Sequence, residues 1–139
     1  MHPINAPVAP TMRDRIATVL MLLSALGALY AFITAIGAVQ SAGPATQQVE
    51  TWRLFGFLMF AGVFVLLGLW PRRLPGLWEL TIFCKVGLTI AEALLIGSSA
   101  VGAQFAAIVD GILSVFLIAA YLLSRGYAAW RPLPKLYTP

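Results

Sequence analysis

The chain has 139 residues, of which 60% are hydrophobic and only 10% charged, and its net charge is +4. A soluble domain would carry about 25% charged residues, so the composition excludes most soluble classes and indicates membrane insertion. A basic excess in a membrane protein usually records topology, so we expect no nucleic-acid partner. With one cysteine, one histidine and no haem or flavin motif, we expect no disulfide, no metal site and no cofactor.

Four apolar segments follow one another along the chain, at residues 16–39, 54–70, 77–97 and 104–124. The first exceeds the 7–15 residues or so of a signal-peptide core, so we interpret it as a mature span. About 20 residues cross a bilayer, a length that the second segment reaches if it starts near Trp52. Short connections make sequential helices antiparallel neighbours. We therefore predict an all-α fold, with residues 1–139 forming one antiparallel bundle of four transmembrane helices.

Lysine and arginine are distributed unevenly about these spans. Only Arg53 lies near one surface, whereas seven fall on the other: Arg13, Arg15, Arg72, Arg73, Arg125, Arg131 and Lys135. The positive-inside rule then places both termini in the cytoplasm of a multi-pass protein of the cell inner (plasma) membrane, with the lipid bilayer as partner. Tryptophans at the span ends are expected at the membrane interface, namely Trp52, Trp70, Trp78 and Trp130. Small residues such as Gly27 and Gly37 are expected to let helices approach closely.

Three ionisable residues lie deep within the predicted spans, where each costs about 2.5–3.5 kcal/mol on insertion scales. Lys85 and Glu92 are seven residues apart, so they share a helix face about 10 Å apart, with Thr89 between them. Asp110 and Ser114 share a face of the next span. Glu92 and Asp110 each lie about six residues, or roughly 9 Å, from the connection between these spans. We therefore expect their carboxyl groups at one depth, with Ser114 nearer Lys85 and Thr89.

The first two spans are expected to contribute to the same polar pocket. Tyr30 and Thr34 lie at a similar depth on one face of the first span. Arg53 is interpreted as an interfacial anchor, or alternatively as a cation over the pocket mouth that meets an anionic substrate group. Glu79 is expected to reach the interface or to meet Arg72 and Arg73.

Two carboxyl groups and one ammonium cannot all be charged without leaving a net negative charge in a low dielectric. Glu92 and Asp110 are therefore expected to share a proton, which allows acid and base chemistry in one site. This predicts a cofactor-independent enzyme of isomerase, cyclase or hydrolase type that acts on a lipophilic small molecule. Its catalytic residues would be Glu92, Asp110 and Lys85, and its substrate-binding residues Tyr30, Thr34, Arg53, Thr89 and Ser114.

Other interpretations of the same residues remain open. The carboxyl groups could couple a small transporter or binding protein to protons or cations, which with four helices would require a homo-oligomer. The chain could instead be a non-catalytic subunit of a membrane complex. Lys85 would then form a buried ion pair with Glu92 or Asp110 that holds two helices in register. Cys84 is expected to be a packing residue.

The layout of four spans in about 140 residues, with Trp-Arg-Leu-Phe-Gly-Phe-Leu-Met-Phe-Ala-Gly at 52–62, resembles the small DoxX-like membrane proteins. Distant four-helix proteins of the sterol-isomerase and sigma-2-receptor kind place acidic residues in a membrane pocket for lipophilic amines or sterols. That resemblance implies a comparable place for Glu92 and Asp110. Small multidrug-resistance transporters carry their essential glutamate in the first span, whereas residues 16–39 contain no acid here.

Overall fold

The computed structural model describes residues 10–98 and 100–131, and all regular structure in these residues is helical. Four long helices follow the chain order and end in one short 3₁₀ helix: α1 (Met12–Ser41), α2 (Gln47–Leu69), α3 (Leu77–Leu94), α4 (Ala103–Ser124) and η1 (Gly126–Trp130). The predicted all-α four-helix fold is confirmed.

The helix boundaries differ from the predicted spans for local reasons. α1 begins early because Thr11 and Asp14 form a capping box, in which the Thr11 hydroxyl accepts from the Asp14 N–H at 3.3 Å. α2 begins at Gln47, so the first connection is only 42–46 and not the longer polar stretch expected. α3 ends at Leu94 instead of residue 97, and Gly97 then turns the chain with a φ of +87°, which favours glycine.

Three of the helices, α1, α2 and α4, are long and apolar enough to cross a membrane. Only 28%, 22% and 22% of their most apolar windows are buried within the protein, so most of their apolar side chains face outward. This is the pattern of a membrane protein. α3 is not in this set, since its 18 residues include Glu79, Lys85 and Glu92. It nevertheless packs along α4 and is about 27 Å long.

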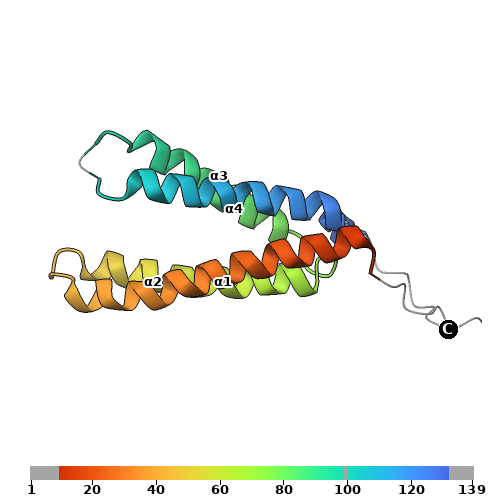
Figure 1. Ribbon diagram of the computed structural model, residues 1–139, viewed down its shortest axis with the longest axis horizontal. Helices are drawn as coiled ribbons and strands as arrows, with labels where there is room; N and C mark the ends of the chain where they lie inside the picture. The colour runs from red at the N-terminus through yellow and green to blue at the C-terminus, as the bar shows by residue number, and fades with distance from the viewer. Residues whose placement is uncertain (1–9, 99, 132–139) are drawn as a thin grey trace, which may run out of the picture.

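The four helices form two hairpins, α1–α2 and α3–α4, which meet mainly where α1 packs on α4. α2 and α3 contact each other at few positions. Figure 1 shows the hairpins close together where α1 begins and α4 ends, and apart where the two hairpin turns lie. We call the first the terminal end and the second the loop end.

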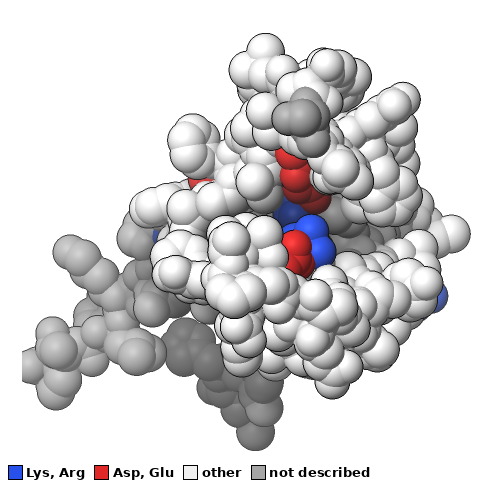
Figure 2. Space-filling view, turned by 90° about the vertical axis from the view of Figure 1, so that its left-hand side faces the viewer, with Lys and Arg blue, Asp and Glu red and all other residues white. Residues whose placement is uncertain are grey.

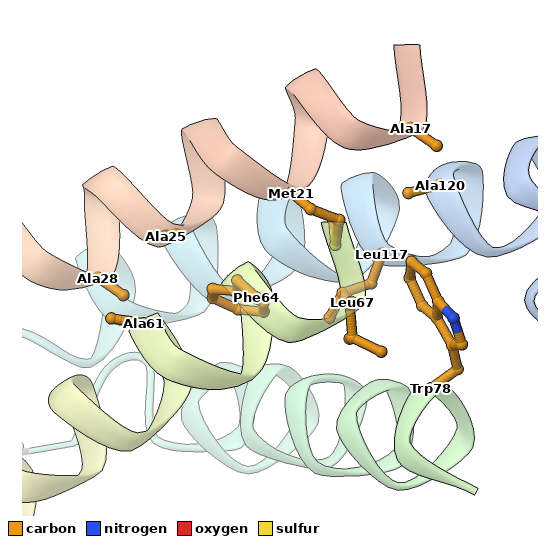
Figure 3. Close-up of a cluster of buried hydrophobic side chains, with 10 residues drawn as sticks. All are labelled: Ala17, Met21, Ala25, Ala28, Ala61, Phe64, Leu67, Trp78, Leu117 and Ala120. Atoms are coloured by element: carbon orange, nitrogen blue, oxygen red, sulfur yellow. The ribbon is translucent and has the colours of Figure 1, made fainter. Parts of the chain in front are cut away.

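The hydrophobic core fills the half of the bundle nearer the terminal end. It draws on all four helices, and its members are Ala17, Met21, Ala25, Ala28, Ala61, Phe64, Leu67, Trp78, Leu117 and Ala120. Figure 3 shows the Trp78 ring directed from α3 toward Leu67 and Leu117. Trp78 lies at the start of α3, but its ring packs in the core, whereas the interfacial position expected for it stays a prediction. Trp78 is 1% exposed and its indole N–H donates to the Pro71 carbonyl at 2.8 Å, whereas Trp52 is 75% exposed.

Polar contacts join the elements at the terminal end. Arg72 forms an ion pair with Asp14, and its Nε donates to the Ser124 carbonyl at 2.7 Å. The Thr18 hydroxyl donates to the Gly68 carbonyl at 3.0 Å. Since Arg72 lies between α2 and α3, this one guanidinium connects the start of α1 with the end of α4.

Glu79 does not pair with Arg72 or Arg73, contrary to one of the two expectations for it. Its Oε1 accepts from the Tyr121 hydroxyl at 2.8 Å and from the Trp130 indole N–H at 3.1 Å. These bonds hold η1 against α3 and α4. Arg72 is occupied by Asp14 and Ser124, which explains why it is not the partner.

Alanine, more than glycine, forms the close contacts of α1. A side chain added at Gly27 or Gly37 would meet nothing within 4 Å, so the role expected for these two glycines is wrong. The buried small residues of this helix are Ala17, Ser24, Ala25, Ala28 and Ala35. Gly68 does permit a close approach, because a Cβ there would lie 3.1 Å from Met21 Cβ.

We expect Gly126→Ala to destabilise the protein by about 1–3 kcal/mol, the usual cost of overpacking. The added Cβ would lie 2.6 Å from Tyr121 Cδ2 and 2.7 Å from Trp78 Cδ1, and these rings are held by their own contacts. Thermal unfolding in detergent measures the loss. Gly62→Ala is the matched control, since nothing lies within 4 Å of its Cβ. Equal melting temperatures for the two variants would contradict the packing argument.

Candidate functional site

Lys85 on α3 and Asp110 on α4 form a buried ion pair. Lys85 Nζ lies 2.8 Å from Asp110 Oδ1, and the two side chains are 6% and 12% exposed. Both residues lie on the inward faces of their helices. Each charge of the pair has an opposite charge as its partner within the protein. An isolated charge in a membrane is costly, so such pairing is expected. Asp110, and not Glu92, is thus the partner of Lys85.

An aromatic ring from the other hairpin covers this ion pair. Lys85 Nζ lies 4.0 Å from the centre of the Phe60 ring of α2, within cation–π range. Phe60 stacks in turn on Phe64, with 6.0 Å between ring centres. No role was predicted for Phe60 from the sequence. The available signal was its spacing from Arg53, since residues seven apart share a helix face.

Two hydroxyl groups lie beside the ion pair, between α3 and α4. Thr89 Oγ1 and Ser114 Oγ are 3.4 Å apart, so the expected proximity of these residues is confirmed. Each hydroxyl also donates to the carbonyl four residues earlier, of Lys85 at 2.8 Å and of Asp110 at 2.7 Å. Gly111 allows this close packing, because a Cβ there would lie 3.5 Å from Thr89 Cγ2. Their predicted role in substrate binding stays a prediction.

Glu92 lies on the face of α3 that carries Lys85, seven residues and about 10 Å from it. Its Oε2 is enclosed by the protein and has no hydrogen-bond partner among the described residues. Glu92 is two residues from the end of α3, so it lies nearer the loop end than expected. The three groups together have a formal charge of −1, and Glu92 is the one that has no ion-pair partner among the described residues.

Tyr30 and Thr34 do not belong to this site. Tyr30 is 71% exposed, and Thr34 is exposed with its hydroxyl bonded to carbonyls of its own helix at 3.0 and 3.2 Å. The inward face of α1 carries Ala28 and Ala35 instead. The small side chains determine how α1 is rotated, and they turn Tyr30 and Thr34 away from the bundle.

Arg53 lies on α2 on the side that faces α3 and α4. It is seven residues from Phe60, whose ring touches Lys85, and therefore lies on the same face about 10 Å nearer the loop end. Its Nη2 is 2.5 Å from Glu50 Oε2, and the Arg53 side chain is 51% exposed. The sequence analysis did not include Glu50 in the site, although Glu50 lies three residues from Arg53 on the same face.

A hollow separates the two hairpins at the loop end, and we call it the inter-hairpin hollow. Figure 2 shows it from that end, with acidic atoms on the α3–α4 side and basic and acidic atoms on the α1–α2 side. The charged residues of this half of the bundle are Glu50, Arg53, Lys85, Glu92 and Asp110. Two other hollows, of about 480 and 370 Å³, lie against the α3–α4 turn and along α4. Neither is lined by any of these five residues, so the inter-hairpin hollow is the candidate site.

The fold and this site define a helical membrane protein with a charged network between two hairpins. Comparisons with protein-family models, with curated proteins and with solved structures find no match for the chain. Its function is therefore inferred from the geometry of the site.

We expect Lys85→Met or Asp110→Asn alone to cost about 3–5 kcal/mol of stability, since each leaves one buried charge without its partner. The double variant should lose much less, because no unpaired charge remains from the pair. Unfolding in a denaturing detergent measures all three. Ser114→Ala is the control for a nearby buried change that leaves the pair intact. A double variant as unstable as the sum of the single variants would show that the pair is not an energetic unit.

Proposed function

We propose that this protein binds a lipophilic small molecule in the inter-hairpin hollow and converts it by acid–base chemistry, with Glu92 as the proton-exchanging group. The single observation that carries this proposal is the enclosed Glu92 Oε2, which has no hydrogen-bond partner among the described residues. A buried polar atom without a partner is uncommon and calls for an explanation. A ligand group in the hollow would supply the partner.

The ion pair gives the three charged residues different parts in this chemistry. Asp110 is bonded to Lys85 at 2.8 Å, so Glu92 is the carboxyl group of the site that has no ion-pair partner among the described residues and is assigned the proton exchange. In an isomerisation, the Glu92 carboxylate would accept a proton from one atom of the substrate and return it to another. Lys85, which is bonded to Asp110 and covered by Phe60, would hold Asp110 in place and would not touch the substrate. No proton is gained or lost over the cycle.

The distribution of contacts favours an enzyme over a transporter. A transport pathway needs access from both sides of the membrane, whereas the terminal end carries the core and the Arg72 contacts. The hollow lies at the loop end alone. Proton-coupled transport, homo-oligomerisation and likeness to DoxX-like proteins stay predictions. A subunit role remains the second candidate, and the buried Lys85–Asp110 pair is the observation that favours it.

We propose further that α3 also crosses the membrane and that both termini are cytoplasmic, in the plasma (inner) membrane. Basic residues gather at the terminal end, namely Arg13, Arg15, Arg72, Arg73 and Arg125, whereas Arg53 is near the loop end. The positive-inside rule supports this orientation. The inter-hairpin hollow would then face the outside of the cell.

Glu92→Gln is expected to abolish co-purification of a bound lipophilic molecule, which native mass spectrometry of the wild type in mild detergent detects as added mass. The substitution keeps the shape of the side chain and removes the exchangeable charge. Glu79→Gln is the matched control, since Glu79 lies on the same helix and bonds Tyr121 and Trp130 at the other end.

Two results would count against the proposed function. One is wild-type protein that carries no ligand after mild extraction and gains none from membrane lipid extracts. The other is a Glu92→Gln variant that retains the molecule fully. Either result, with normal folding of the variants, would favour the subunit role.

The proposed orientation predicts opposite accessibility for cysteines at the two ends. In a Cys84→Ser background, Ala45→Cys in the α1–α2 turn should react with a membrane-impermeant thiol reagent added to intact cells. Arg73→Cys, at the terminal end, should react only after the cells are opened. The reverse pattern would place the termini outside.

A further inference from the structure

The two hairpins are joined firmly at one end and loosely at the other. At the terminal end they share the core, and Arg72 connects the start of α1 to the end of α4. Toward the loop end, the Phe60 ring over Lys85 is the side-chain interaction that joins α2 to α3 among the described residues. No hydrogen bond of the described residues joins the hairpins beyond that point.

The contact between Phe60 and Lys85 places Arg53 and Glu92 at the same level of the bundle. α2 runs from the loop end and α3 runs toward it, so Arg53 is seven residues before Phe60 and Glu92 seven residues after Lys85. Each lies about 10 Å closer to the loop end than the contact, on the helix face that carries the contact residue. The two side chains therefore lie on opposite walls of the inter-hairpin hollow.

The two side chains have opposite charges and unused hydrogen-bonding groups, namely donors on Arg53 and an acceptor on Glu92. Arg53 pairs with one oxygen of Glu50 through Nη2, and a guanidinium carries five N–H donors in all. Glu92 has an enclosed oxygen without a partner among the described residues. In a membrane, an uncompensated carboxylate is costly, and a charge-assisted bond to arginine offsets that cost.

We infer that Arg53 exchanges partners between Glu50 and Glu92, and that its bond to Glu92 closes the two hairpins over the hollow. With Arg53 on Glu50 the hollow is open and Glu92 can receive a ligand. With Arg53 on Glu92 the hollow is closed and the uncompensated charge is neutralised. The hairpins rotate as rigid units about the terminal end, where the core and Arg72 hold them.

This exchange rests on the proposed function, because it regulates access to the same hollow and to Glu92. A ligand that binds Glu92 competes with Arg53 for the carboxylate and returns Arg53 to Glu50. Closure itself requires no ligand, so it can be measured separately from ligand binding.

The test measures distances between spin labels in lipid nanodiscs, in a Cys84→Ser background. Labels at Val49 on α2 and Phe105 on α4, both exposed, report the separation of the hairpins at the loop end. Labels at Ile16 on α1 and Leu122 on α4, also exposed, report the terminal end. We expect two populations for the first pair and a single narrow distribution for the second.

Variants of the two competing positions should shift the loop-end distances in opposite directions. Glu50→Gln frees Arg53 for Glu92 and should enrich the shorter distance. Arg53→Gln should leave only the longer distance, whereas Arg53→Lys, which keeps the charge, should retain part of the shorter population. The terminal-end distance should stay unchanged in each variant, which also checks folding.

One loop-end population that is identical in the wild type, Glu50→Gln and Arg53→Gln would overturn the partner exchange. If Arg53→Gln did not fold, Glu50→Gln alone would test the partner exchange. A shift toward the shorter loop-end distance is expected for Glu50→Gln, and general destabilisation of the bundle would not produce it. Loss of ligand in Glu92→Gln together with unchanged loop-end distances in all variants would overturn closure and leave the proposed function standing.

Discussion

The structure depends above all on the buried bond between Lys85 and Asp110. A lysine and an aspartate at this depth are tolerated because they are 2.8 Å apart and largely shielded. The bond determines which faces of α3 and α4 meet, and Thr89, Gly111 and Ser114 pack beside it as a result. Phe60 then fixes the level of α2 against α3 through the Lys85 ammonium. One ion pair thus relates three of the four helices.

Stability and function are divided between the two ends of the bundle. The terminal end contains the hydrophobic core, the Arg72 contacts and the bonds from Tyr121 and Trp130 to Glu79. The loop end contains charged groups whose bonding is incomplete. A rigid end that holds two hairpins and a looser end that carries a polar site are compatible, because movement of the looser end does not disturb the core.

The sequence predicted the helices well, since long apolar runs and short connections leave few other folds. It also predicted that Lys85 could pair with Asp110, because the spacing on two antiparallel neighbours follows from helix geometry, whereas the part of Glu92 stays a prediction. It could not predict how α1 is rotated. Tyr30 and Thr34 share a face, but the alanines on the opposite face pack inward, and no local rule ranks these faces.

The sequence also could not predict which residues bond to Arg72 and Glu79. Arg72 and Glu79 are close along the chain, yet Arg72 bonds Asp14 and Ser124, and Glu79 accepts from residues of α4 and η1. These partners are 42 to 58 residues away, so only the folded bundle brings them together. Phe60 was missed for a related reason, since its spacing of seven from Arg53 indicates only a shared helix face, and the cation over its ring comes from another helix.

The polarity of α3 and the separation of the hairpins have a common physical origin. A helix with three charged residues in 18 cannot present them to lipid, so its charged face must be turned toward protein or water. α4 neutralises one charge through Asp110, and Tyr121 with Trp130 satisfies Glu79. Glu92 is the one charged residue of α3 that neither set of contacts satisfies. It lies where the α1–α2 hairpin diverges from α3 and the direct packing between the hairpins ends. The same position that denies Glu92 a permanent partner places it at the edge of the hollow, where a proton-exchanging group would meet a ligand.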